Sequence, residues 1–150
     1  MSSPTGSYEH RTWWGVHDLT ERLTNPAFLE AAITCAFALG AADGSVSPEE
    51  YDALLDRLLI LGDVDRDAAD EHLTAAANLL ERDGDGALIA KAAAALVDHG
   101  AAEAALMLAL AVALADDDFA TSEREVATRL ATALRLGSLD LDAAVAIVRG

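Results

Sequence analysis

Apolar residues recur along most of the chain at the three- and four-residue spacing of amphipathic helices. In residues 47–62, for example, Leu54, Leu55 and Leu58 fall on one face of a helix. Runs in which apolar and polar residues alternate, as they do in strands, are missing. With Gly and Pro at the breaks, the pattern predicts an all-α single-domain bundle of seven or eight helices joined by short loops.

The expected helices cover the chain from residue 13 onward. They are residues 13–24, 26–42, 47–62, 65–80, 87–100, 101–115, 122–137 and 140–149. Asn25 stands at the start of the second, Asp65 or Asp67 opens the fourth, and Asp140 is expected to cap the last. The run 101–115 is apolar almost all round, so we expect it to be the central buried helix. Residues 1–12 are rich in Ser, Pro, Gly and Thr, and we expect a flexible segment there, before a domain of residues 13–150.

Composition supports helices and a packed core. Hydrophobic residues make up 53% of the chain, which argues against disorder, and alanine, the best helix former, dominates them. The single cysteine, Cys35, lies in an apolar run and is expected to be buried rather than reactive. Trp13 and Trp14 are adjacent and point to different faces of a helix, so we expect one in the core and one at the surface.

Charge narrows the range of partners. The 150 residues carry a formal net charge of −16, from 10 basic and 26 acidic residues. Phosphate backbones and anionic lipid surfaces would repel such a protein, so nucleic-acid and membrane-surface binding are disfavoured. Cations or a basic protein are the natural complements. No apolar run is long enough to cross a bilayer and no signal peptide is recognisable, so we expect a cytoplasmic location.

An acid-rich loop occurs twice, in residues 41–50 and 114–123, at a constant offset of 73 residues. Each copy has an apolar helix before the loop and an amphipathic helix after it. Such a duplication predicts two related helical hairpins packed around a pseudo-twofold axis.

Helix capping accounts for part of each loop without any ligand. Ser47 and Glu50 have the spacing of a capping box, in which a serine at the N-cap and a glutamate three residues later satisfy each other's backbone N–H groups. Residues 122–125 are a second candidate box. Capping does not account for Asp43, whose carboxylate opposes the helix dipole at the end of the preceding helix, and Asp116 repeats that misfit.

The alternative is a metal site shared by the two loops. Gly44, Val46 and Glu50 keep the spacing of the later part of an EF-hand loop, but Leu39 and Ala41 stand at its first ligand positions, so the loop is not an EF-hand. Each loop would supply two carboxylates. Four carboxylates suit Ca²⁺, Mg²⁺ or Mn²⁺ better than Zn²⁺, which favours His or Cys. The four candidate ligands are Asp43, Glu50, Asp116 and Glu123.

The segments "ADGSVSPEE" and "AVALADDDFATSEREVATRLATALRLG" resemble the TerB-like tellurite-resistance proteins, which combine an A-x-DG-x-(hydrophobic)-x-x-x-E turn with a second acidic turn near the C-terminus. The resemblance covers roughly residues 26–148. It implies an all-helical fold of two related halves and a divalent-metal site at the two turns. Asp117 departs from the pattern, because the family usually has glycine there, and Asp118 is an added acid. The ligands carried over are Asp43, Glu50, Asp116 and Glu123.

The resemblance also implies a function in bacterial tellurite resistance and stress responses, together with other proteins of the same system, some of them membrane-bound. It implies no enzymatic activity. We therefore expect a metal-responsive interaction module. The alternative is a metal-free structural or adaptor domain that binds a protein partner through Trp13, Trp14 or an apolar groove. A hydrolase with a carboxylate-held metal is a third candidate, but the sequence has no Ser/His/Asp grouping, phosphate-binding glycine loop or Cys/His cluster.

Overall fold

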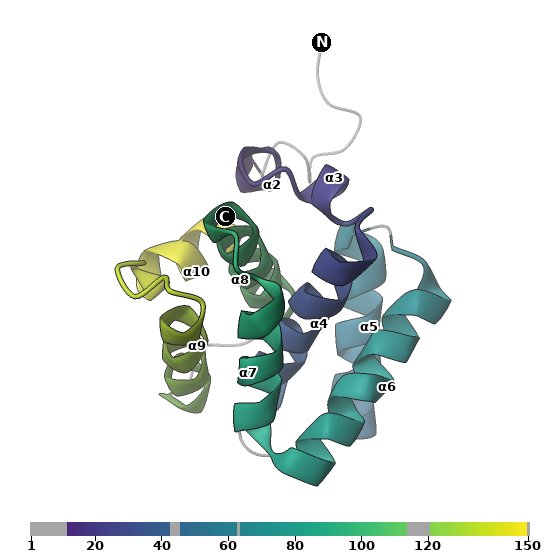
Figure 1. The fold of residues 1–150 in the computed structure, drawn as a ribbon. Helices are drawn as coiled ribbons and strands as arrows, with labels where there is room; N and C mark the ends of the chain where they lie inside the picture. The colour runs from purple at the N-terminus through teal and green to yellow at the C-terminus, as the bar shows by residue number, and fades with distance from the viewer. Residues whose placement is uncertain (1–11, 43–45, 63, 114–120, 150) are drawn as a thin grey trace.

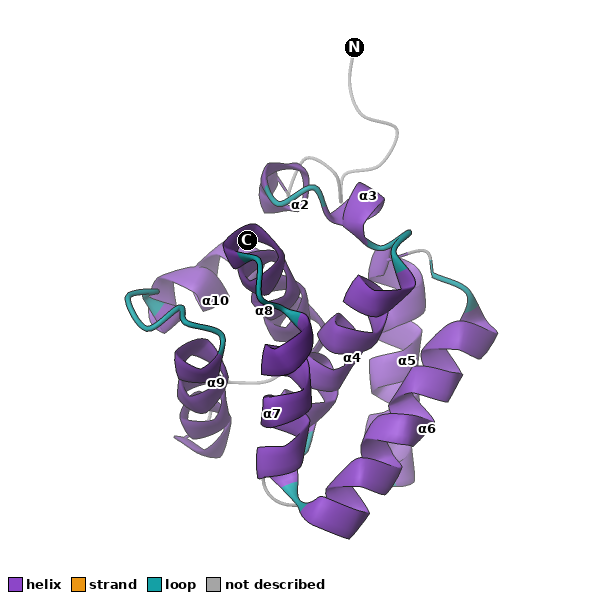
Figure 2. Cartoon of the chain, viewed as in Figure 1, coloured by secondary structure: helices purple, strands orange, loops and turns teal. Residues whose placement is uncertain are grey.

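The computed structural model describes residues 12–42, 46–62, 64–113 and 121–149. All regular structure in these ranges is α-helical, as Figure 2 shows, which confirms the predicted all-α fold. The helices of the described ranges are α2 (Thr12–Val16), α3 (Leu19–Arg22), α4 (Pro26–Gly40), α5 (Pro48–Gly62), α6 (Arg66–Asp83), α7 (Asp85–Ala95), α8 (His99–Ala113), α9 (Thr121–Ala133) and α10 (Leu141–Arg149).

Helices α4 and α8 form the centre of the bundle (Figure 1). Eleven of the fifteen residues in each are buried, and the two helices pack extensively against each other. Helices α5, α6, α7 and α9 pack against α4, and α5 and α10 pack against α8. The predicted central helix is therefore confirmed in α8, and α4 shares its place in the core.

The helix boundaries repeat at the same 73-residue offset as the two acidic loops. Helices α4 and α8 have equal lengths and correspond residue for residue, and α5 and α9 begin at corresponding positions, Pro48 and Thr121. The repeat seen in the sequence is thus also present in the bounds of α4 and α8 and in the starts of α5 and α9. The pseudo-twofold axis stays a prediction.

Short polar side chains begin several helices, as the sequence predicted. Asn25 accepts a hydrogen bond from the backbone N–H of Ala27 at the start of α4, and Asp65 accepts one from Ala68 in α6. These bonds satisfy backbone donors that have no partner within the first turn of a helix. Gly62 ends α5 as expected, but the break placed at Gly100 lies earlier, at residues 96–98.

The N-terminal part differs from the single helix predicted for residues 13–24. Asp18 adopts a left-handed backbone conformation with φ 53° and ψ 39°, which a right-handed helix cannot continue through. The segment is therefore split into α2 and α3, and the described residues contain nine helices rather than seven or eight. The predicted flexible segment 1–12 lies outside the described residues, except for Thr12, which begins α2.

Both tryptophans are buried, with 5% of Trp13 and 6% of Trp14 exposed, so the prediction that one would lie at the surface is wrong. The turn at Asp18 lets α3 pack against the short α2. The two rings meet edge to face, with centroids 5.6 Å apart. Trp14 Nε1 donates to Thr20 Oγ1 at 2.8 Å, whereas the buried Nε1 of Trp13 has no hydrogen-bond partner among the described residues.

Cys35 lies in α4 and is completely buried, as predicted. Burial raises the pKa of its thiol to about 12, because the thiolate would lose its hydration in the core. The thiol therefore stays protonated at neutral pH and is a poor nucleophile.

None of the helices in the described ranges combines the length and the apolar character needed to traverse a bilayer.

Candidate functional site

A pocket of about 110 Å³ lies where α4, α5, α8 and α9 meet. Two of the four predicted metal ligands, Glu50 and Glu123, line it together, although they are 73 residues apart in the sequence. The pocket is lined by Gly40, Glu50, Ala53, Leu54, Arg57, Ala113 and Glu123.

The lining residues include two pairs that the 73-residue offset relates, Gly40 with Ala113 and Glu50 with Glu123. Gly40 and Ala113 directly precede the acidic loops, and Glu50 and Glu123 are the last residues of these loops. The other two predicted ligands, Asp43 and Asp116, lie outside the described residues, as do Asp117 and Asp118. The two loops that contain them connect the four helices that form the pocket.

Gly40 allows α4 and α5 to approach closely at the wall of the pocket. A Cβ atom at this position would lie 3.1 Å from Cδ1 of the buried Leu54, which is closer than ordinary van der Waals contact. The corresponding residue at the end of α8 is Ala113, so the two walls are similar but not identical.

Glu50 has a structural function that the sequence predicted. Its Oε1 accepts a hydrogen bond from the backbone N–H of Ser47 at 2.7 Å, and Ser47 Oγ accepts one from the backbone N–H of Glu50 at 3.1 Å. This reciprocal pair is a capping box, and it stabilises the first turn of α5. The box occupies Oε1 and leaves Oε2 able to coordinate a cation.

The prediction of a second capping box at residues 122–125 is wrong. Helix α9 begins at Thr121, so Ser122 lies inside the helix and is not its N-cap. The residue that corresponds to Ser47 is Ala120, and alanine has no side-chain oxygen with which to complete a box. Glu123 therefore occupies the same sequence position as Glu50 but without the serine.

Arg57 is the basic residue that lines the pocket, and sequence analysis did not single it out. From α5, its Nη1 donates a hydrogen bond to the backbone oxygen of Val112 in α8 at 3.1 Å. Carbonyls near the C-terminal end of a helix have partial negative charge, which favours a guanidinium there. One feature of the sequence could have indicated Arg57. The repeat is broken there, because Leu130 occupies the position in α9 that corresponds to Arg57.

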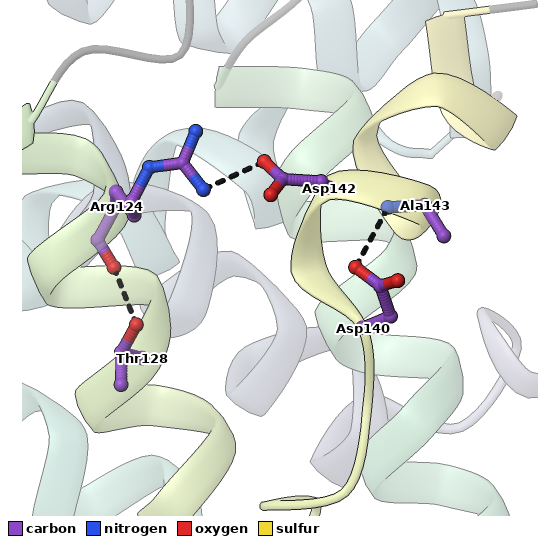
Figure 3. A network of polar contacts seen from close by, with 5 residues as sticks. All are labelled: Arg124, Thr128, Asp140, Asp142 and Ala143. Carbon is purple, nitrogen blue, oxygen red and sulfur yellow. Dashed lines mark hydrogen bonds and ion pairs between the residues drawn. The ribbon is translucent and has the colours of Figure 1, made fainter.

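Ion pairs hold α9 at two points, one of them at the residue that follows Glu123. Arg124, the residue after Glu123, places Nη1 2.6 Å from Oδ1 of Asp142 in α10, as Figure 3 shows. The backbone N–H of Ala143 donates to Asp140 Oδ1 in the same view, which confirms Asp140 as the predicted cap of α10.

The second ion pair joins α9 to α7. Arg129 Nη1 lies 2.9 Å from Asp85 Oδ2, and both side chains are more than one third exposed. The hydrogen bond from the Arg129 guanidinium lowers the pKa of Asp85 below its usual value, because it stabilises the charged carboxylate. Helix α9, and Glu123 with it, is thereby fixed to two neighbours.

The donor chemistry of the pocket fits a hard divalent ion. Carboxylate oxygens are the preferred ligands of Ca²⁺, Mg²⁺ and Mn²⁺, and two carboxylates line one cavity. None of the lining residues is His or Cys, which disfavours Zn²⁺. Within the described ranges, which exclude Asp43 and Asp116, no group of three or more His, Cys, Asp or Glu side chains has metal-binding geometry. The described residues thus supply half of the predicted ligand set.

The fold and the pocket define a class of protein: an all-helical module in which the helices that flank two related acid-rich loops line one cavity. A family model for "Tellurite resistance protein TerB" matches residues 29–146, most of the chain. The chain therefore belongs to the TerB family, as its acidic turns suggested. No curated protein and no solved structure gave a significant match. The matched range begins within α4 and ends within α10, so it leaves out α2 and α3.

Membership of the TerB family relates this chain to tellurite resistance. The TerB domain is a helical module and is not known as a family of enzymes.

Proposed function

We propose that this chain is a metal-responsive interaction module of a bacterial tellurite-resistance or stress-response system. One observation supports this most directly: Glu50 and Glu123, which occupy the same position in the two acidic loops, line a single pocket. Asp43 and Asp116 occupy a second pair of equivalent positions, within the same two loops. The proposed ligand set is therefore Asp43, Glu50, Asp116 and Glu123.

The pocket carboxylates come from two helices that share α4 as a neighbour and otherwise pack on different helices. Glu50 belongs to α5, which packs on α4, α6 and α8, and Glu123 belongs to α9, which packs on α4, α7 and α10. A bound divalent ion neutralises clustered carboxylates. With Glu50 and Glu123 on the same ion, α5 and α9 become linked directly, which stabilises the closed arrangement of the two halves and shapes a surface for a partner.

The partner we propose is another protein of the same system, with a basic face. The formal net charge of −16 favours a positively charged partner and opposes binding to nucleic acid. A membrane-bound partner with a basic cytoplasmic segment fits this requirement. The chain itself would act in the cytoplasm.

A metal-free adaptor domain is the alternative, and the capping box supports it, because capping explains Glu50 without any ligand. The burial of Trp13 and Trp14 removes the exposed tryptophan through which such an adaptor was expected to bind.

Melting temperatures test the metal-binding proposal. The wild type is measured in EDTA and then with Ca²⁺, Mg²⁺, Mn²⁺ or Zn²⁺. A ligand that binds only the folded state at about 100 times its Kd adds about 2.7 kcal/mol of stability. We expect a rise with a hard ion that the Asp43→Ala/Asp116→Ala double variant abolishes.

Two further variants separate coordination from capping. Glu50→Gln can still accept the capping hydrogen bond but loses the carboxylate, and Glu123→Gln makes the same change in the second loop. Both should lose the metal-dependent rise. Glu49→Gln is the matched control, because Glu49 is an exposed neighbour of Glu50 that does not line the pocket. The absence of any rise in the wild type with all four ions would overturn the metal proposal and leave the adaptor function.

A further inference from the structure

The pocket that we propose as a cation site already has a cation in its wall. Arg57 lines it with Glu50 and Glu123, and its guanidinium is bound to the Val112 carbonyl. The guanidinium carries a full positive charge. A divalent ion that enters this pocket therefore meets one fixed positive charge.

Neither capping nor helix packing requires an arginine at this position. Leu130, the corresponding residue of α9, is completely buried and packs in the core. The two halves therefore differ in the chemistry of this side chain. Helix α5 places a cation in the wall of the pocket with the carboxylates, and α9 places an apolar side chain in the core. Among the described residues, Arg57 shares the pocket wall with two carboxylates and donates to the carbonyl near the end of α8.

Arg57 and Glu123 are partly buried, so their charges are screened less than those of fully exposed side chains. Two carboxylates in one pocket repel each other, and a guanidinium in the same wall offsets that repulsion. The Arg57 side chain is also long and flexible, so its charged end can move while its stem stays packed on α5.

We propose that Arg57 is an internal counter-cation, which balances Glu50 and Glu123 without a metal ion and competes with a divalent ion for them. This inference rests on the proposed function for the identity of the competing ligand. Arg57 thereby sets the ion concentration at which the module responds. It also keeps α5 tied to α8 in the metal-free state through the bond to Val112.

Isothermal titration with Mn²⁺ tests this competition. Arg57→Gln removes the charge and keeps a donor for the Val112 carbonyl. We expect its Kd for Mn²⁺ to fall by at least about tenfold relative to the wild type, because a like charge beside the ion is lost. Its melting temperature in EDTA should fall, because the two carboxylates lose their counter-cation. Arg57→Lys keeps the charge and should stay close to the wild-type Kd.

Arg82→Gln is the matched control, because it removes the same charge from an exposed arginine of α6 that pairs with its neighbour Asp83. Its Kd for Mn²⁺ should equal that of the wild type. If Arg57→Gln binds Mn²⁺ no more tightly than the wild type does, the inference is wrong even though the metal site stands.

The two proposals fail in different measurements. If the wild type binds no Mn²⁺, the metal-responsive function is contradicted. If Arg57→Gln alone binds Mn²⁺, the competition between Arg57 and the ion is still supported. If neither protein binds Mn²⁺, the competition is overturned as well. If Arg57→Gln does not fold, the Nε–Hε signals of the wild-type arginines decide the question by NMR. Mg²⁺ should shift the Arg57 signal and leave that of Arg82 in place, and an unmoved Arg57 signal would contradict the inference.

Discussion

Helices α5 and α9 each follow an acid-rich loop and each place one glutamate in the pocket, yet they are attached to the rest of the bundle by different kinds of contact. In α5, the hydroxyl of Tyr51 donates to Asp70 Oδ1 in the following helix, α6, at 2.7 Å. In α9, the corresponding residue is Arg124, and it forms an ion pair with Asp142 in the following helix, α10. The same connection is made by a neutral donor in one half and by a charged donor in the other.

At the inward-facing position the difference is reversed, because the charged side chain now belongs to α5 and the uncharged one to α9. Helix α5 uses a charged side chain, Arg57, to reach a backbone carbonyl of α8, whereas α9 uses the buried Leu130 at the same position. The start of α5 is fixed by the Ser47–Glu50 capping box, and the second loop lacks that serine. The two copies therefore share the positions of their helices and the pocket glutamates, but they are stabilised by different contacts.

The largest effect we expect comes from truncating the inward-facing residue of each helix. Leu130→Ala leaves a cavity in the core and should cost roughly 2–5 kcal/mol of unfolding free energy. Arg57→Ala removes one hydrogen bond to a backbone carbonyl and should cost less, about 1.5–3 kcal/mol. Urea denaturation in EDTA measures both. Equal losses would contradict the view that α9 is held by packing and α5 by a polar contact.

The next effect concerns the starts of the two helices. Ser47→Ala breaks the capping box of α5 and should cost about 1 kcal/mol. Ser122→Ala is the matched change in α9, where the serine lies inside the helix, and it should alter stability by no more than about 0.5 kcal/mol. Chemical denaturation of both variants checks the pair. A similar loss in both would show that Ser122 caps α9 after all.

The smallest effect concerns the ion pair between Arg129 of α9 and Asp85 of α7. Because both side chains are largely exposed, we expect a coupling energy of about 0.2–1 kcal/mol in a double-mutant cycle with Asp85→Asn and Arg129→Gln. The pKa of Asp85 is lower in the folded state than in the unfolded state, so the stabilisation is present above the ordinary value of 3.8 and is lost as pH falls through the folded-state pKa.

Salt and acid are the checks on that ion pair. The coupling should disappear in concentrated NaCl and below the folded-state pKa of Asp85. The Tyr51–Asp70 hydrogen bond of α5 is the internal reference, because a neutral donor makes it less sensitive to screening. A coupling energy that persists in high salt would show that the pair does not act through charge.

Local features of this fold could be predicted from the sequence because they depend on a few adjacent residues. Asn25, Asp65 and Asp140 cap helices where the sequence placed caps, and the apolar run of α8 is buried as its pattern indicated. The left-handed conformation of Asp18 leaves no trace in helical periodicity, so the split between α2 and α3 and the burial of both tryptophans could not be predicted.

The candidate site was partly predictable for a different reason. The 73-residue offset relates Glu50 to Glu123, and a repeat of that kind predicts proximity in space without any contact information. Arg57 was missed because a basic residue on an amphipathic helix is ordinarily part of the solvent-facing side. Only its mismatch with Leu130 in the repeat marks it as unusual.

Both tryptophans of this chain lie in α2, before residue 29, where the match to the TerB family begins. Helix α3 precedes the first residue of α4 by a short turn, whereas the pocket lies at the last residue of α4, about 21 Å further along at 1.5 Å per residue. The tryptophan fluorescence of the protein therefore reports on how firmly its N-terminal helices cover the core. It is an optical signal separate from events at the pocket, and a chain trimmed to residues 29–146 would lose it completely.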